Sequence, residues 1–324
     1  MEGRASMRAM VINETGAPEV FQAAELPMPV KLASELLVRV VAASINPIDA
    51  KTRAGKGGSA GIPGYPAVLG HDFSGVVVES PFEFCPLQPG DEVFGMVPVP
   101  RYQGSFAEFL VVSTMNVARK PATLSHLEAA AVPLAALTAW GLVVDVAKAH
   151  RGQRILIHAG AGGVGHFAVQ FAAHFGAHVI ATGSARNAEW LRELGASEVV
   201  DYTTTRFEDV VHDVDTVIDL IGNVHDNTGT RSLQTLRPGG LIVNVPTGSW
   251  PSFIADATAA GMQATHYKLA PDGRTLEGIA KLLDSGDIRV HVDRVFELDQ
   301  LAEANRALEE GHTRGKIVFR VAEG

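Results

Sequence analysis

The sequence predicts an α/β protein of two domains, in which a small, partly open β-barrel is followed by a doubly wound parallel sheet. Three observations support this fold class. The chain has 324 residues, which is long for one compact core. Short apolar segments separated by Gly and Pro fill its first 125 residues, and strand–helix alternation begins near residue 126. A glycine-rich turn joins a strand to a helix early in this second part.

The first part reads as strands without intervening helices. Segments rich in β-branched or aromatic residues cover 35–47, 73–79, 90–97 and 104–112. Turn residues separate them at the short spacing that is typical of all-β folds. The many glycines between them indicate the sharp corners of a small, partly open barrel.

The second part alternates between strands and helices. We expect buried strands at 154–160, 178–182, 198–202, 216–222 and 241–246. After the first strand, apolar residues recur at helical spacing (Val164, Phe167, Ala168, Phe171, Ala172 and Phe175), and Gly176 ends the helix. Such repeats require parallel strands with right-handed crossovers, and therefore a doubly wound sheet. We place the domains at 1–125 and 126–272, and the pattern changes again after residue 272.

Composition excludes several classes of function. The net charge is −9, and acids and bases are mixed along the chain, which argues against a nucleic-acid groove or an anionic membrane surface. Cys85 is the only cysteine, which fits a reducing compartment. The apolar run 129–146 is interrupted by Thr138 and Asp145 and is interpreted as core. Residues 1–7 lack the apolar centre of a signal peptide, so we expect a cytoplasmic protein.

A G-x-G-x-x-G motif predicts a dinucleotide site. It comprises Gly160, Ala161, Gly162, Gly163, Val164 and Gly165. The motif follows a buried strand and opens an amphipathic helix, which is the context that makes it specific. The glycines allow a tight turn and a close approach of the backbone to a pyrophosphate at the positive end of the helix. The alternative is a glycine turn that binds nothing.

The end of the second strand of this sheet predicts NADPH rather than NADH. An NAD site usually has Asp or Glu there to bind the ribose 2′-hydroxyl, but this chain has Gly183, followed by Ser184 and Arg186. A hydroxyl and a guanidinium suit a 2′-phosphate, and Tyr202 ends the next strand. The alternative for Arg186 is a solvated surface residue. The turns after the fourth and fifth strands also border this edge of the sheet; they hold Gly222, Val245, Pro246 and Thr247.

Several dispersed motifs resemble one known family along nearly the whole chain. They are AASINPIDAKTRAG (42–55), LGHDFSGVV, LQPGDEVFG, GSFAEF, AAAVPLAALTAW, HAGAGGVGHFAVQFA and the closing GKIVFRV. Their order is similar to that of the medium-chain dehydrogenase/reductase superfamily, in its zinc-independent NADPH:quinone oxidoreductase branch related to zeta-crystallin. The resemblance implies a GroES-like substrate domain, a Rossmann cofactor domain and an active site between them. It also implies that residues 273–324 return to the substrate domain.

The resemblance also bears on zinc. Zinc-dependent members use a cysteine where this chain has Asn46, the histidine that corresponds to His71, and a third ligand just before the cofactor domain. A catalytic zinc needs three protein ligands. The segment 132–140 contains no Cys, His or acid, and a structural zinc would need more cysteines than Cys85. We therefore expect no metal. For His71 we expect a place in the cleft or a hydrogen bond beside Asp72.

Without a metal, the acceptor must already be electrophilic, as quinones and α,β-unsaturated carbonyls are. The resemblance places Asn46 and Thr138 beside the nicotinamide, where Asn46 would polarise a carbonyl or orient the ring. The alternative for Asn46 is a turn residue before Pro47. Lys51 and Tyr65 are the candidate proton donors. The alternatives are a solvated surface residue for Lys51 and a residue that caps or packs a helix for Thr138.

We thus predict an NADPH-dependent quinone reductase. Two alternatives remain: an enone or enoyl-thioester double-bond reductase, and an NADPH-binding protein without catalytic activity. By resemblance, residues 252–270 pair two cofactor domains edge to edge, so a homodimer is expected.

Overall fold

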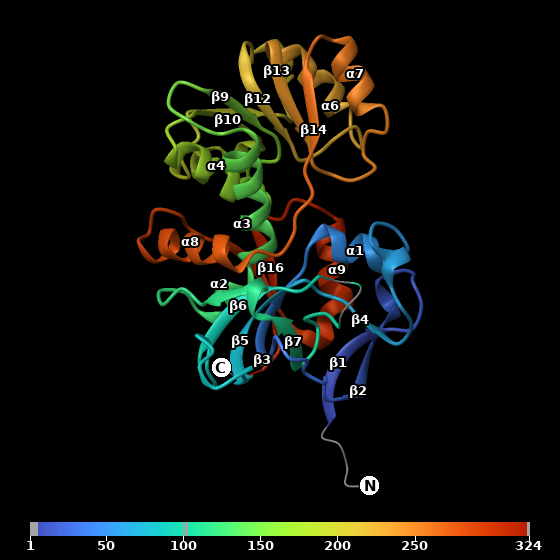
Figure 1. Cartoon of the computed structure of the whole chain (residues 1–324). Helices are drawn as coiled ribbons and strands as arrows, with labels where there is room; N and C mark the ends of the chain where they lie inside the picture. The colour runs from blue at the N-terminus through green and yellow to red at the C-terminus, as the bar shows by residue number, and fades with distance from the viewer. Residues whose placement is uncertain (1–5, 99, 101–102, 323–324) are drawn as a thin grey trace. The chain divides into compact units, whose positions relative to one another are not determined.

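The computed structural model of the chain describes residues 6–98, 100 and 103–322 (Figure 1). These residues form two units. One joins Met1–Leu137 to Ala270–Gly324, and we call it the barrel unit; the other, Thr138–Leu269, is the sheet unit. The predicted absence of a signal peptide concerns residues 1–7, of which residues 1–5 lie outside the described part of the chain.

The sheet unit is built on a six-stranded parallel sheet in the order β11-β10-β9-β12-β13-β14 (Figure 1). Its strands are β9 (Arg154–Ile157), β10 (His178–Gly183), β11 (Glu198–Asp201), β12 (Val214–Asp219), β13 (Leu236–Asn244) and β14 (Gln263–His266). Its helices are α4 (Gly165–His174), α5 (Ala188–Glu193), α6 (Thr228–Ser232) and α7 (Phe253–Ala259), with a π-helical turn η4 (Gly141–Val146) before β9. The chain moves outward from β9 to β11 and then returns to the other side of β9 with β12. This order confirms the predicted doubly wound sheet.

Apolar burial explains why β9 and α4 form where the sequence predicted them. Ile155, Leu156 and Ile157 are completely buried, as expected for a central parallel strand that is covered on both faces. On α4, the buried rings of Phe167 and Phe171 stack 6.3 Å apart between centroids. The helix ends where Gly176 adopts a left-handed φ of +84°, a conformation that glycine accepts without strain.

One feature of α4 was not foreseen. The helix is buried over nearly all its length, including His166, whose ring packs 4.0 Å from that of Phe167 between centroids and whose Nδ1 lies 3.0 Å from the Gly162 carbonyl oxygen. The apolar periodicity suggested one buried face only and missed this burial. At the end of the helix, His174 is exposed.

The barrel unit contains two antiparallel sheets and the end of the chain. A three-stranded sheet has the order β2-β1-β4, and a larger sheet runs β15-β16-β3-β5-β6-β8, with β7 also paired to β3. The strands before the sheet unit are β1 (Ser6–Ile12), β2 (Phe21–Pro27), β3 (Glu35–Ser44), β4 (Ala67–Val68), β5 (Asp72–Glu79), β6 (Glu92–Met96), β7 (Phe109–Ser113) and β8 (Val117–Arg119). The helices there are α1 (Pro47–Arg53), α2 (His126–Ala130) and α3 (Pro133–Trp140). The last of these helices runs into the sheet unit.

The end of the chain completes the larger sheet. It forms α8 (Gly273–Asp284), β15 (Val292–Glu297), α9 (Leu301–Glu309) and β16 (Lys316–Arg320). Strand β16 pairs with β3 in antiparallel register, with Val318 opposite Ser44 and Phe319 opposite Ala43 (Figure 1). The first residue of β16, Lys316, is thereby brought to the start of α1.

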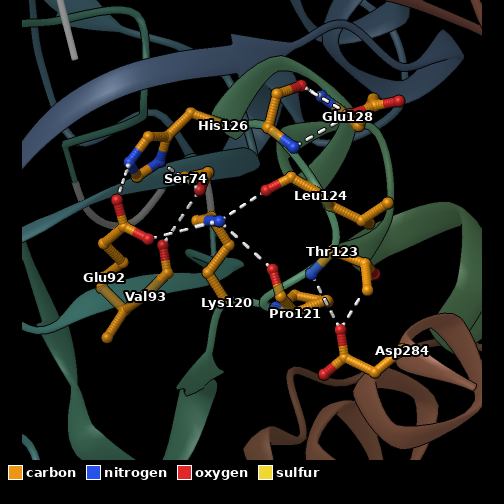
Figure 2. Close-up of polar contacts among 11 residues, drawn as sticks. Ser74, Glu92, Val93, Lys120, Pro121, Thr123, Leu124, His126, Glu128 and Asp284 are labelled. Atoms are coloured by element: carbon orange, nitrogen blue, oxygen red, sulfur yellow. Dashed lines mark hydrogen bonds and ion pairs between the residues drawn. The ribbon is translucent and has the colours of Figure 1, made fainter.

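Polar contacts fix α2 against the barrel (Figure 2). Ser125 caps the helix in a reciprocal pair of bonds with Glu128. Asp284 of α8 accepts hydrogen bonds from the backbone and the hydroxyl of Thr123, at 3.0 and 2.9 Å. Lys120 reaches Glu92 of β6 at 3.2 Å and also donates to the Pro121 carbonyl oxygen. These contacts hold the segment that leads from β8 into α2 and α3.

Candidate functional site

The turn after β9 has the shape that a pyrophosphate site requires. A Cβ on Gly165 would lie 2.1 Å from the carbonyl oxygen of Ala159, so only glycine fits there. A Cβ on Gly160 would lie 3.0 Å from that of Ala181. Ala161, Gly162, Gly163 and Val164 complete the turn, which leads into α4. The first turn of a helix presents backbone N–H groups that have no acceptor within the helix, and these suit an anion.

Gly183, Ser184 and Tyr202 meet at the carboxyl ends of β10 and β11. Gly183 pairs with Asp201, and the backbone N–H of Tyr202 donates to the Gly183 oxygen at 3.3 Å. The Tyr202 side chain is exposed, as is that of Arg186 in the short turn η5 (Ala185–Asn187). The structure therefore brings these predicted residues together at the carboxyl ends of the strands.

Asp201 is a carboxylate at this edge that the sequence analysis did not consider. Its Oδ1 accepts from the hydroxyl and the backbone N–H of Thr203, at 2.7 and 3.0 Å, and these bonds lower the pKa of Asp201. The carboxylate is thus engaged in forming the turn after β11.

The turns after β12 and β13 also lie together. A Cβ on Gly222 would come 2.0 Å from the Ser249 hydroxyl, and the backbone N–H of Asn223 donates to the Ser249 oxygen at 3.3 Å. Val245, Pro246 and Thr247 form the turn that leads to Ser249. The predicted residues Gly222 and 245–247 are therefore neighbours.

Asp219 fixes these two turns. Its Oδ1 accepts from the backbone N–H groups of Ile221 and Gly222, at 2.9 and 2.8 Å. Its Oδ2 accepts from the Asn244 side chain at 3.0 Å. Because Asp219 is completely buried and bonded within the protein, its role is structural.

His158, at the end of β9, links three elements behind the glycine turn. Its Nδ1 lies 3.2 Å from the Thr182 hydroxyl, and its Nε2 lies 2.8 Å from the Ser232 hydroxyl. The Thr182 hydroxyl also accepts from the backbone N–H of Ala159, at 3.2 Å. Burial lowers the pKa of His158 to about 4, with Asp219 opposing this shift. The ring is therefore neutral at physiological pH and supports the turn.

The barrel unit holds a buried polar cluster, which we call the Asn46 cluster. Its members are Ser44, Asn46, Asp49, His71, Asp72 and Lys316. Asp72 is at its centre: Oδ2 accepts from the side chains of Ser44 and Asn46, both at 2.9 Å, and Oδ1 accepts from the backbone N–H of Leu134 at 2.8 Å. The cluster thus joins α1, β3, β5, β16 and the start of α3.

Lys316 determines how the Asn46 amide is oriented. Its ammonium donates to Oδ1 of Asn46, to the Ile45 carbonyl oxygen at 3.1 Å and to Asp72 at 3.4 Å. Three acceptors match the three donors of a charged ammonium, although burial lowers the pKa of Lys316. Since a lysine only donates, the amide oxygen of Asn46 must face it and the amide nitrogen must face Asp72. Among the described residues, Asp72 is the one side chain that accepts from this amide nitrogen, which has two N–H groups.

His71 is bound to this cluster through Asp49. The two side chains form a 2.6 Å contact between Nδ1 and Oδ1, and the other oxygen of Asp49 accepts from the backbone N–H of Asn46 at 2.8 Å. Burial by itself lowers the pKa of His71, but the charge of Asp49 and its hydrogen bond outweigh burial. The pKa of His71 is therefore raised. The carboxylate beside His71 is Asp49, while Asp72 bonds Asn46.

The other predicted barrel residues lie outside these bonds. Lys51 is half-buried on α1, and Tyr65 is 48% exposed before β4. Within the described residues, neither side chain is hydrogen bonded to the Asn46 cluster. Thr138 is buried in α3, where the sheet unit begins.

Sequence reasoning missed Lys316 and the bonding role of Asp49. The second had a signal, because Asp three residues after an N-cap Asn is a capping pattern. The sequence contains no comparable signal for Lys316 apart from its place in the closing GKIVFRV motif, because 270 residues separate it from Asn46.

A second polar chain has the order of a serine nucleophile, a base and an acid (Figure 2). The Ser74 hydroxyl lies 2.7 Å from Nδ1 of His126, whose Nε2 lies 3.2 Å from Glu92. However, Ser74 is completely buried and bonds the Val93 carbonyl oxygen at 3.1 Å. A substrate cannot reach it, so the contacts tie β5 and β6 to α2.

The Asn46 cluster does not fit a catalytic zinc. His71 supplies one imidazole, but Asn46 replaces a thiolate by an amide, and both oxygens of Asp49 are already bonded. Among the residues that the structure describes, no group of three or more His, Cys, Asp and Glu side chains is arranged to hold a metal ion.

The chain matches two families. Residues 33–122 match the alcohol dehydrogenase GroES-like domain, and residues 194–319 match the family described as zinc-binding dehydrogenase. The first match, with the structural likeness below, confirms the GroES-like part of the predicted fold.

Similar proteins cover nearly the whole chain. The mouse mitochondrial NAD(P)H oxidoreductase RTN4IP1 is 36% identical over 97% of this chain and 89% of its own length. The tomato 2-methylene-furan-3-one reductase is 35% identical over 97% of this chain and 79% of its own. Among solved structures, the quinone oxidoreductase from Coxiella burnetii is 36% identical with a TM-score of 0.92, over 98% of this chain and 100% of that one. In the described part of this chain, every helix is too short or too polar to cross a membrane.

Proposed function

The chain belongs to the medium-chain dehydrogenase/reductase superfamily as an NAD(P)H oxidoreductase, and from this premise we propose that it transfers hydride from NADPH to a quinone or similar conjugated carbonyl without zinc. The observation that carries the proposal is the Asn46 cluster. A catalytic metal would need three protein ligands, whereas this cluster offers the amide of Asn46 and the imidazole of His71. An acceptor that is already electrophilic needs only orientation and hydrogen-bond donors.

We propose that the sheet unit binds the cofactor along the carboxyl ends of its strands. The glycine turn 160–165 would hold the pyrophosphate, and Gly222 and 245–247 would border the nicotinamide half. Thr138 is proposed to lie near the nicotinamide. The bound cofactor supplies the hydride.

The preference for NADPH rests on residues that follow β10 and β11. Gly183 brings no carboxylate to the ribose, while Ser184, Arg186 and Tyr202 offer donors for a 2′-phosphate. Asp201 is the nearest acid, and its bonds to Thr203 direct it into its own turn.

In the barrel unit, we propose that Asn46 donates its remaining N–H to the acceptor oxygen. Lys316 and Asp72 hold the amide in the orientation that makes it a donor. Lys51 and Tyr65 remain candidate proton donors from the sequence, but neither is held in place by the cluster.

The second candidate function is reduction of a carbon–carbon double bond in an enone or enoyl thioester. It is favoured by the tomato relative, whose name specifies a 2-methylene-furan-3-one. Both reactions share the hydride step and differ in the atom that receives the proton.

Initial rates of NADPH oxidation test the proposal. We would compare a simple para-quinone with a 2-alkenone, with and without a zinc chelator, and determine bound metal. Faster turnover of the quinone that the chelator leaves unchanged is expected. Preference for the alkenone would favour double-bond reduction. NADPH binding without turnover of either acceptor would favour a non-catalytic protein, and stoichiometric zinc would contradict the metal-free site.

We further propose a homodimer and a cytoplasmic location. Strand β14 is one of the two edge strands of its sheet, and the unpaired backbone groups of an edge strand can pair with another chain. Sedimentation as a monomer at micromolar concentration would contradict the dimer. The single cysteine, Cys85, is free and buried, which fits a reducing compartment.

A further inference from the structure

His71 is the most accessible titratable member of the Asn46 cluster. Its side chain is 9% exposed, compared with 4% for Lys316 and 1% for Asp49. Nδ1 is occupied by the buried Asp49. A ligand would therefore have to approach the ring from the side away from that carboxylate.

The hydrogen bonds assign the proton positions of this ring. A carboxylate only accepts, so Nδ1 of His71 carries a proton and donates it to Asp49. Asp49 is itself held by the backbone N–H of Asn46. Among the residues that the structure describes, Nε2 of His71 has no hydrogen-bond partner. Nε2 is therefore the atom that is available to a ligand.

The charges of the cluster favour a protonated ring. Asp49 and Asp72 contribute two negative charges and Lys316 one positive charge. A neutral His71 leaves the buried cluster with one net negative charge, whereas a protonated His71 makes it neutral. Buried charges are stable only when they are compensated. Asp49 and Asp72 accordingly favour the charged ring, and Lys316 opposes them.

We propose that protonated His71, held by Asp49, is the proton donor to the oxygen of the acceptor. As the hydride arrives on the conjugated system, the Nε2–H bond breaks and an O–H bond forms. The hydride and this proton together add two electrons and two hydrogens to the acceptor. His71 is left neutral, still donating through Nδ1 to Asp49, and regains a proton from water. This assignment rests on the proposed function and differs from it by naming the donor.

The first test needs no cofactor. The pKa of the His71 ring is measured by NMR in the apoprotein, and its signal is assigned by its loss in His71→Gln. We expect a value above the ordinary histidine value, and a lower one in Asp49→Asn, because that variant removes the charge that holds the proton. An unchanged pKa in Asp49→Asn would overturn the proposed role of Asp49.

The second test follows turnover of the para-quinone at saturating NADPH as a function of pH. Wild-type kcat should fall as pH rises through the measured pKa of His71, since only the protonated ring donates. His71→Gln should lower kcat by about 100-fold and abolish this pH dependence, with the Kd for NADPH unchanged. The control His174→Gln, at an exposed position on α4, should retain the wild-type rate and profile.

The outcomes separate the two proposals. A folded His71→Gln protein with the wild-type rate and pH profile would overturn the role of His71 but leave the reductase intact. Absence of wild-type turnover on both the quinone and the alkenone would overturn the proposed function, and this inference with it. If His71→Gln does not fold, Asp49→Asn provides the test. The pH profile of kcat in this variant must shift by as much as the pKa of His71 measured by NMR. An unshifted profile would refute the assignment.

Discussion

The ammonium of Lys316 donates to the side-chain oxygen of Asn46, although 270 residues separate them in sequence. The contact is possible because β16 pairs with β3, the strand that leads into α1. The last strand of the chain therefore orients the amide that we propose to contact the acceptor. The larger sheet of the barrel unit is incomplete without residues that follow the sheet unit.

Replacement of Lys316 by Met should destabilise the protein by about 3–5 kcal/mol, because it leaves Asp72 buried without its cation. Urea unfolding measures the change. Lys281→Met, at an exposed position on α8, is the control and should change stability by less than about 0.5 kcal/mol. Adding Asp72→Asn to Lys316→Met should recover part of the loss, since the uncompensated charge is then gone. Equal losses in the single and double variants would contradict this account.

The sheet unit could be predicted from sequence because its signals are local. The glycine turn and the helix after it are consecutive, and parallel topology brings Gly183, Gly222 and 245–247 to one edge. The Asn46 cluster could not be predicted from sequence, because its contacts depend on the register of β16 with β3. The burial of His166 was also missed, since periodicity does not show that α4 is covered on several sides.

Gly165→Ala should abolish tight NADPH binding. The added Cβ would overlap the carbonyl oxygen of Ala159 at 2.1 Å, so the turn must open and its N–H groups lose their arrangement. We expect the Kd for NADPH, measured by fluorescence titration, to rise at least about tenfold. Gly278→Ala is the matched control: this helical glycine has nothing within 4 Å of its Cβ position, so binding should not change. Wild-type affinity in Gly165→Ala would show that the turn does not bind the cofactor.

Gly183→Asp should reverse the preference for NADPH. The new carboxylate would repel a 2′-phosphate and accept a hydrogen bond from a ribose 2′-hydroxyl. Compared with Gly183→Ala, NADPH should bind at least about tenfold more weakly, while NADH should bind equally or better. The alanine variant carries the same steric cost, a Cβ 2.7 Å from Leu191, so the comparison isolates the charge. Equal losses for both cofactors in Gly183→Asp would place the 2′-phosphate elsewhere.

His158 should make the protein less stable in mild acid. Its folded pKa of about 4 lies below the unfolded value of about 6.5, so between these values the unfolded chain binds a proton that the native protein does not. Stability should therefore fall as pH drops from 6.5 to 4, by about 3 kcal/mol from this residue. Urea unfolding of wild type and His158→Asn across this range measures the effect.

The His158→Asn variant should be less stable than wild type at pH 6.5, because it loses the bonds to Thr182 and Ser232. Its free energy of unfolding should nevertheless fall less on acidification. His174→Gln, which alters an exposed ring, should follow the wild-type slope. Parallel pH dependences for wild type and His158→Asn would mean that the buried ring takes up its proton without unfolding.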